Sequence, residues 1–202
     1  ESFMDELASI NEVDPLDFRL KHLKDDRAIN LLKTLSEASG WYEKELKAGH
    51  GRGLGFARYK NTKCYAGVIV ELEVDDYGNI NLKEAFIASD SGQIIDREGL
   101  KSQLEGGFIQ SASWTLKEEV KFEGEEVLSA DWESYPIIKF SEIPNLQTIL
   151  IERPNDPPLG AGEATQGPTA AAIANAVFNA TGLRLRKIPF TPENLRSEAA
   201  ST

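Results

Sequence analysis

The sequence has few of the residues that build disulfides and metal sites: one cysteine, Cys64, and two histidines, His22 and His50. A single cysteine excludes a disulfide within this chain, and it excludes a cysteine-rich metal or iron–sulfur site built by this chain alone. The two histidines lie far apart and show no metal-ligand spacing. We therefore expect no metal ion to be bound directly by side chains of this chain.

Basic residues and long apolar runs are also scarce. The chain has 22 Lys and Arg against 33 Asp and Glu, a net charge of −11. Phosphate binding needs a basic surface, so this charge argues against a nucleic-acid partner. No stretch approaches the roughly 20 apolar residues of a membrane helix, and no signal peptide is recognisable. With 41% hydrophobic and 27% charged residues, the chain has the composition of a domain that buries a core.

The first 48 residues read as a helical segment. Asp14 is placed to cap a helix that has Pro15 at its first position, and Asp25 is placed to cap the next. Gly40 is a suitable residue to end that helix. The chain starts at Glu1, inside a helical pattern, so we expect a piece of a longer protein. We predict a helical segment over residues 1–48, the end of a preceding subdomain, and a C-terminal domain over residues 49–202.

Strand patterns follow this segment. Glycines alternate at Gly51, Gly53 and Gly55. A dinucleotide-binding loop needs a strand before it and a helix after it, and here the order is reversed. We interpret the glycines as a strand on which another backbone or a ligand packs closely. Alternating apolar residues over 64–90, interrupted by a turn at 75–79, predict two further strands.

Helical periodicity returns over residues 92–116 and places Gln103 on or near the apolar side. A buried polar side chain needs a hydrogen-bonding partner, so Gln103 is either a helix-packing amide or a ligand-binding residue. Gly106 and Gly107 each cost a helix about 1 kcal/mol relative to alanine, which suggests close approach to another group. Farther on, three aromatic residues are expected to anchor an irregular segment: Trp132, Tyr135 and Phe140.

A single carboxylate, Glu163, lies in a loop of glycine, proline and alanine before an uncharged helix predicted over residues 168–182. Small residues let a backbone approach a bulky group, and Pro168 suits the first helical position. The uncharged helix should be buried on most sides. Glu163 is therefore either a site carboxylate or a residue that favours the positive end of a helix, worth about 0.3–1 kcal/mol.

Several of these segments together resemble the molybdenum hydroxylases, the family of xanthine dehydrogenase and aldehyde oxidoreductase. The similarity is greatest to the C-terminal part of the molybdopterin-binding large subunit of the isoquinoline 1-oxidoreductase type. It extends over nearly the whole chain in the family's order, through residues 1–8, 14–15, 51–57, 103–107, 160–163, 172–176 and 185–193. The resemblance implies an α+β fold in which a mixed sheet packs against helices.

The resemblance also implies roles. Glu163 matches the family glutamate that acts as general base, taking a proton from Mo–OH while an aldehyde or N-heterocycle is oxidised with water-derived oxygen. Gln103 and Gly162 match positions beside molybdopterin, in its cytosine dinucleotide form. The implied partners are a small-molecule substrate and a [2Fe–2S] subunit or domain. We expect this piece alone to be inactive and without cofactor. The sequence leaves open whether the protein is in the periplasm or the cytoplasm. The alternative is a non-catalytic subunit-interaction module.

Overall fold

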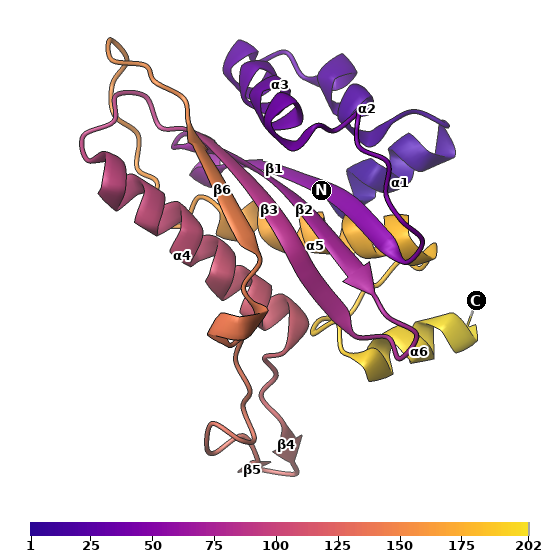
Figure 1. The fold of residues 1–202 in the computed structure, drawn as a ribbon. Coiled ribbons are helices and arrows are strands. Elements are labelled where there is room, and N and C mark those ends of the chain that lie inside the picture. Colours follow the sequence, from indigo (N-terminus) through magenta and orange to yellow (C-terminus); the bar gives the residue numbers. More distant parts are fainter. Residues whose placement is uncertain (202) are drawn as a thin grey trace.

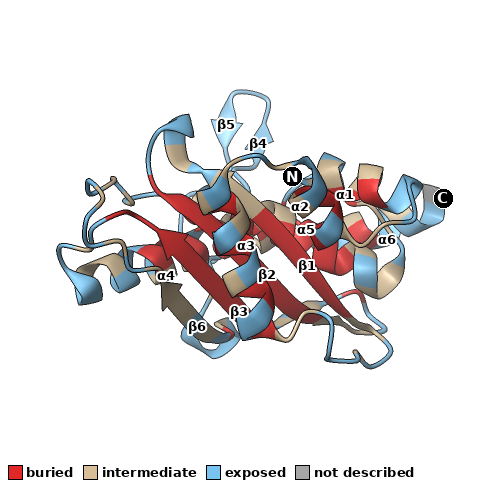
Figure 2. Ribbon diagram, turned by 90° about the horizontal axis from the view of Figure 1, so that it is seen from above, coloured by how far each residue is buried: buried red, intermediate tan, exposed pale blue. Residues whose placement is uncertain are grey.

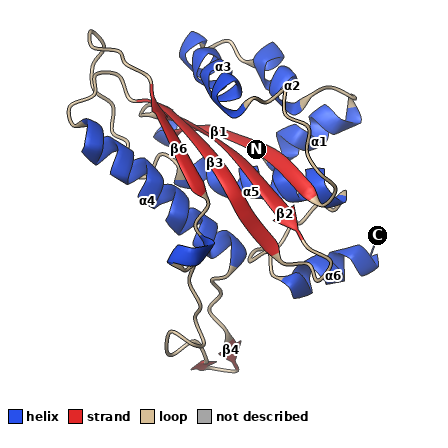
Figure 3. Cartoon of the chain, viewed as in Figure 1, coloured by secondary structure: helices blue, strands red, loops and turns tan. Residues whose placement is uncertain are grey.

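A four-stranded mixed sheet with helices on both faces forms the centre of the fold (Figures 1 and 3). The computed structural model describes residues 1–201. The helices are α1 (Ser2–Ile10), α2 (Pro15–His22), α3 (Asp26–Ser39), α4 (Arg97–Leu116), α5 (Gln166–Thr181) and α6 (Pro192–Ser201). The strands are β1 (His50–Arg58), β2 (Tyr65–Val74), β3 (Ile80–Asp90), β4 (Phe122–Glu123), β5 (Glu126–Val127) and β6 (Asn145–Leu150), with short 3-10 turns η1 (Tyr59–Asn61) and η2 (Phe140–Glu142).

The main sheet has the strand order β1-β2-β3-β6. Strands β1, β2 and β3 are antiparallel, whereas β6 lies parallel to β3, so the sheet is mixed. The parallel step needs a long crossover, and α4 with the β4–β5 hairpin supplies it. This arrangement confirms the predicted α+β fold with a mixed sheet packed against helices.

The alternation along the strands divides the core into two layers. Val68 and Val70 of β2 face α4 and α5, where they pack with Phe108 and Ile173. Ile69 lies between them in sequence and faces the opposite side, where α2 and α3 cover the sheet. Buried residues accordingly follow the strands, and the outer sides of the helices are exposed (Figure 2). A domain boundary near residue 48 stays a prediction, and residue 202 lies outside the described residues.

Helix α5 lies directly on strand β1 because the strand has glycine at every second position. A Cβ added at Gly53 would be 2.2 Å from the Ala172 carbonyl oxygen, and one added at Gly55 would be 2.2 Å from the Pro168 carbonyl oxygen. Two strand residues and four helix residues advance by similar distances, about 6.7 and 6 Å, so each glycine meets a successive helical turn. This contact confirms that the alternating glycines accommodate another backbone.

The asparagines of α5 satisfy the free edge of β1. Asn175 Nδ2 donates to the Leu54 carbonyl at 2.9 Å, and Asn179 Oδ1 accepts from the Arg52 amide at 2.9 Å. These groups point away from β2 and would otherwise be an unpaired strand edge. The helix therefore covers the edge of the sheet as well as its face.

A buried carboxylate connects α3 with the start of the long loop that leads to α5. Asp90, at the end of β3, is fully buried and forms ion pairs with Arg27 and Arg153. Burial alone would raise the pKa of Asp90, but the hydrogen bonds from the two guanidinium groups hold it below its ordinary value. The amide of Gly92 donates to the same carboxylate at 3.2 Å.

The helix caps of the N-terminal segment are as predicted. The Asp14 and Asp25 side chains accept from the first amides of α2 and α3, and Gly40 ends α3 with φ 60°. Two predicted helix starts are wrong. Helix α4 begins at Arg97 because Asp96 caps it, and α5 begins at Gln166, which places Pro168 inside its first turn.

Two of the predicted aromatic anchors are also wrong. Trp132 is 78% exposed and Phe140 is 94% exposed, while Tyr135 is half-buried and donates to Glu118. They lie in the exposed segment around the β4–β5 hairpin, which projects from the rest of the fold (Figures 1 and 2). No helix among residues 1–201 is both long and apolar enough to cross a membrane.

Candidate functional site

The Glu163 loop is held in place by backbone hydrogen bonds to the ends of the central strands. The Leu159 amide donates to the Ser91 carbonyl at 2.7 Å, and the Cys64 amide donates to the Gly160 carbonyl at 3.2 Å. The chain then turns over residues 162–165 and enters α5. Glu163 is exposed on this turn, and its carboxylate reaches across to the residue that follows strand β1 rather than into the protein.

Helix α4 approaches the start of α5 closely at a glycine. A Cβ added at Gly107 would be 2.6 Å from Thr165 Oγ1, and this hydroxyl donates to the Leu104 carbonyl at 2.8 Å. Ser111 Oγ donates to the Gln166 carbonyl at 3.1 Å. The expected close approach is thus confirmed at Gly107, whereas Gly106 faces open space.

These contacts bring the three predicted site residues to one place. Gln103, on the exposed side of α4, donates from Nε2 to the Gly162 carbonyl at 3.3 Å, and Glu163 is the next residue. The expected position of Gln103 on or near the apolar side of the helix is therefore wrong, and its amide bonds the carbonyl of the loop rather than a group in the core. The roles of Gln103, Gly162 and Glu163 in catalysis or cofactor binding stay predictions.

A hollow of about 240 Å³ lies beside this junction. Gln103 and Gly162 are on its wall, together with Ser91 and Gln93 from the segment after β3 and Asp96 at the start of α4. The hollow is lined half by aliphatic side chains and half by residues that supply amide, hydroxyl, carboxylate or glycine backbone groups. It can therefore hold a polar, hydrogen-bonding group, and the carboxylate at position 96 disfavours an anion there.

Tyr59 completes the site, and the sequence analysis did not identify it. Its hydroxyl donates to Glu163 Oε2 at 2.6 Å across 104 residues of sequence. The hydrogen bond to this carboxylate raises the pKa of the Tyr59 hydroxyl above its ordinary value, so the hydroxyl stays protonated as a donor. No local pattern marks such a residue, because only the packing of α5 on β1 brings the two together.

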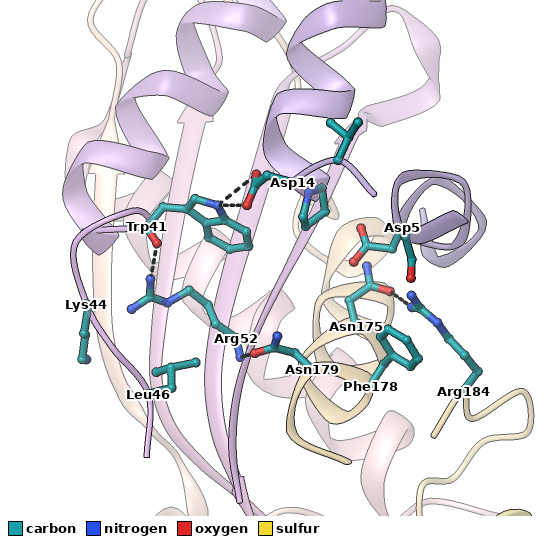
Figure 4. A pocket seen from close by; sticks show the side chains of 13 residues that line it. Asp5, Asp14, Trp41, Lys44, Leu46, Arg52, Asn175, Phe178, Asn179 and Arg184 are labelled. Atoms are coloured by element: carbon teal, nitrogen blue, oxygen red, sulfur yellow. Dashed lines mark hydrogen bonds between the residues drawn. The ribbon is translucent and has the colours of Figure 1, made fainter. Parts of the chain in front are cut away.

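A larger cavity, about 350 Å³, lies along the C-terminal half of α5 (Figure 4). Glu163 is not among the residues that line it. Its charged side chains serve one another and the backbone. Arg52 is paired with Glu71 and donates to the Trp41 carbonyl at 2.7 Å, while the Trp41 indole donates to Asp14. Since these groups are committed to the fold, the cavity's size alone does not make it the better candidate site.

The surroundings of Cys64 and His22, the other residues considered from the sequence, are those of residues that stabilise the fold. Burial raises the pKa of the Cys64 thiol to about 12, as expected for a small buried residue rather than a nucleophile. The His22 ring lies 4.6 Å from that of Phe18, on the exposed side of α2. Within residues 1–201, no three His, Cys, Asp or Glu side chains are grouped so that they could hold a metal ion.

Comparison with known proteins identifies the family to which the chain is similar. Residues 16–144 match the model of the molybdopterin cofactor-binding domain. The chain is 40% identical to one of the subunits of nicotinate dehydrogenase from Pseudomonas putida, and 29% identical to the beta subunit of isoquinoline 1-oxidoreductase from Brevundimonas diminuta. These alignments include 98% and 95% of the chain but only 18% and 25% of the relatives, so the chain spans a quarter of their length or less.

A solved structure shows the same fold. Aldehyde oxidoreductase from Desulfovibrio gigas superposes with a TM-score of 0.81 at 15% identity, over 99% of this chain and 40% of that one. The similarity includes the helices of residues 1–48 as well as the sheet, because nearly the whole chain is covered.

Proposed function

The chain belongs to the molybdopterin cofactor-binding domain family of the molybdenum hydroxylases, and we propose that it carries the general base, Glu163, of such an enzyme. The observation that carries the proposal is the junction of Tyr59, Gln103 and the turn of Gly162 and Glu163, built by three separate parts of the fold. A lone helix-end carboxylate would not need this junction. The resident group, molybdopterin with molybdenum, supplies the redox chemistry when bound.

The residues present fit one part of that group. A pterin presents alternating hydrogen-bond donors and acceptors, and the Gln103 amide keeps its oxygen and one N–H available after donating to Gly162. Gly162 has no side chain to narrow the hollow, which at about 240 Å³ is smaller than the roughly 300–1,000 Å³ of a complete small-molecule site. We infer that Gln103 and the Gly162 backbone form one wall, and that residues outside this chain form the rest.

The role of Glu163 in this proposal is to accept a proton. Glu163 Oε2 accepts a hydrogen bond from the Tyr59 hydroxyl. We therefore assign Oε1 as the atom that takes the proton of the water-derived hydroxyl that attacks the substrate. A positioned general base of this kind contributes about 10²–10⁴-fold to the rate. The exposed position of Glu163 in this chain leaves that oxygen accessible to a group outside it.

For the substrate we propose an aldehyde or, in preference, an electron-poor N-heteroaromatic ring. The names of the relatives at 40% and 29% identity support the ring, since one is a nicotinate dehydrogenase and the other an isoquinoline 1-oxidoreductase. Electrons removed from the substrate need an acceptor, and Cys64 alone could not ligate a cluster. We therefore propose a separate [2Fe–2S] subunit or domain as partner, and the cytosine dinucleotide form of the cofactor.

The test is Glu163→Gln in the full-length enzyme. Glutamine has the same shape and can still accept from Tyr59, but it cannot take a proton. We expect turnover to fall by about 10²–10⁴-fold, with molybdenum content unchanged. The matched control is Glu193→Gln on α6, where the side chain is 76% exposed and turnover should persist.

Two results would contradict the proposal. Unchanged turnover of the Glu163→Gln enzyme, at full molybdenum content, would remove Glu163 from catalysis. A full-length protein that holds no molybdenum, under conditions that load a control enzyme, would favour the alternative of a non-catalytic interaction module, in which Glu163→Ala should be tolerated.

A further inference from the structure

The bond between Tyr59 and Glu163 joins two loops that are far apart in sequence. Tyr59 follows β1, and Glu163 precedes α5, which packs on β1 through the glycines. The donor–acceptor distance of 2.6 Å is that of a strong hydrogen bond from a hydroxyl to a carboxylate. It is the contact that fixes the direction of an otherwise exposed side chain.

The backbone around Tyr59 is held tightly. Its amide donates to the Cys64 carbonyl at 2.8 Å, and its carbonyl accepts from the Lys63 amide at 2.9 Å. Between Tyr59 and Lys63, the residues Lys60 and Asn61 adopt φ values of 48° and 58°, which residues other than glycine rarely take. Such a conformation persists only where its surroundings determine it.

The same short turn is bonded to the Glu163 loop. The Cys64 amide donates to the Gly160 carbonyl, three residues before Glu163, so the two loops share a backbone hydrogen bond as well as the side-chain one. The Tyr59 ring is partly buried and packs against the core cluster to which α4 and α5 contribute. The hydroxyl is therefore presented from a fixed support rather than from a mobile loop.

We propose that Tyr59 is a positioning residue for the base: it holds Glu163 Oε2, and so directs Oε1 toward the reacting group. This inference rests on the proposed function of Glu163. Lys60 of η1 is a charged neighbour of Tyr59, with its Nζ 5.3 Å from the centre of the Tyr59 ring.

The test is Tyr59→Phe in the full-length, cofactor-loaded enzyme. The change removes one hydroxyl and leaves the packed ring in place. We expect kcat to fall about tenfold while KM changes little, because the substrate still binds and only the base is misplaced. A crystal structure of the variant should show the Glu163 carboxylate turned from its position. Tyr77→Phe, at a tyrosine that is 77% exposed in the 75–79 turn, is the matched control and should change none of these.

A double variant separates the two proposals. If Tyr59 acts through Glu163, then Tyr59→Phe should lower the rate less than twofold in the Glu163→Gln background. A tenfold loss in that background, or an unmoved Glu163 carboxylate in the single variant, would overturn the positioning role while leaving Glu163 as base. An active Glu163→Gln enzyme would overturn the proposed function, and the role of Tyr59 with it.

Discussion

Replacing Gly53 with alanine should push helix α5 away from strand β1. The new Cβ would be 2.2 Å from both the carbonyl oxygen of Ala172 and the amide nitrogen of Ala176. Both are backbone atoms in the middle of a helix, so neither can rotate away. Restoring an ordinary contact of about 3.4 Å requires a separation of about 1.2 Å.

That displacement determines how much stability the Gly53→Ala substitution removes. The two hydrogen bonds from the α5 asparagines to Arg52 and Leu54 are 2.9 Å long and would stretch to about 4 Å, beyond hydrogen-bonding range. Their loss costs about 1 kcal/mol each, and overpacking costs about 1–3 kcal/mol more. Alanine restricts the unfolded chain and returns about 0.4–1 kcal/mol. We expect the free energy of unfolding to fall by about 2–4.6 kcal/mol.

Equilibrium urea unfolding of the 202-residue chain, followed by far-UV circular dichroism, measures this change. The matched control is Gly106→Ala in α4, where a new Cβ meets nothing within 4 Å and helix propensity should raise stability by up to about 1 kcal/mol. If Gly53→Ala unfolds within about 1 kcal/mol of the parent chain, the backbone contact between α5 and β1 is not what the glycines provide.

Further predictions concern Asp90 and Cys64. Asp90→Asn leaves Arg27 and Arg153 without their carboxylate, but their side chains are 25% and 28% exposed, so we expect a loss of about 2–4 kcal/mol at pH 7, less than for a wholly buried pair. Because the folded-state pKa of Asp90 is lowered, its contribution is present above the ordinary carboxyl pKa and is lost as pH falls through the folded value. The difference between parent and variant in urea unfolding should therefore be smaller at pH 3 than at pH 7, and an equal difference would contradict the ion pairing. Cys64, whose thiol has a pKa raised by burial to about 12, should resist iodoacetamide at pH 8 and react fully in guanidinium chloride; rapid labelling of the folded chain would show that the thiol is accessible.

The elements that were predictable are those with local causes. Asp14, Asp25 and Gly40 define helix ends through their own side chains or φ angles, and the alternation of Val68 and Val70 with Ile69 follows from the two-residue repeat of a strand. Each of these signals is contained within a few residues. The family's motifs in turn led to Gln103, Gly162 and Glu163 by resemblance, and the fold brings these three together.

The features that the sequence did not predict have two causes. Some depend on neighbours that are distant in sequence, and others arose because aromatic residues were assumed to be buried. Phe140 and Trp132 were expected inside because they are aromatic, but large apolar side chains also occur at protein surfaces. The start of α5 was assigned to Pro168, whereas contacts of Thr165 and Gln166 with α4 stabilise an earlier first turn. Tyr59 could not be found at all, since its partner is 104 residues away.

The glycines of β1 also affect the candidate site, because they determine how α5 is oriented on the strand. Helix α5 has 16 residues and spans about 24 Å, and it meets the strand at Gly51 near one end and at Gly55 near the other. A rod held at a single point could pivot, and a tilt of only about 5° would swing its far end by about 2 Å. Misplacement of about 1 Å can cost a catalytic group about a hundredfold in rate. Contacts at three successive glycines prevent that rotation. The glycines at alternate positions of β1 therefore fix the orientation of α5, and with it the position of the carboxylate that lies just before the helix.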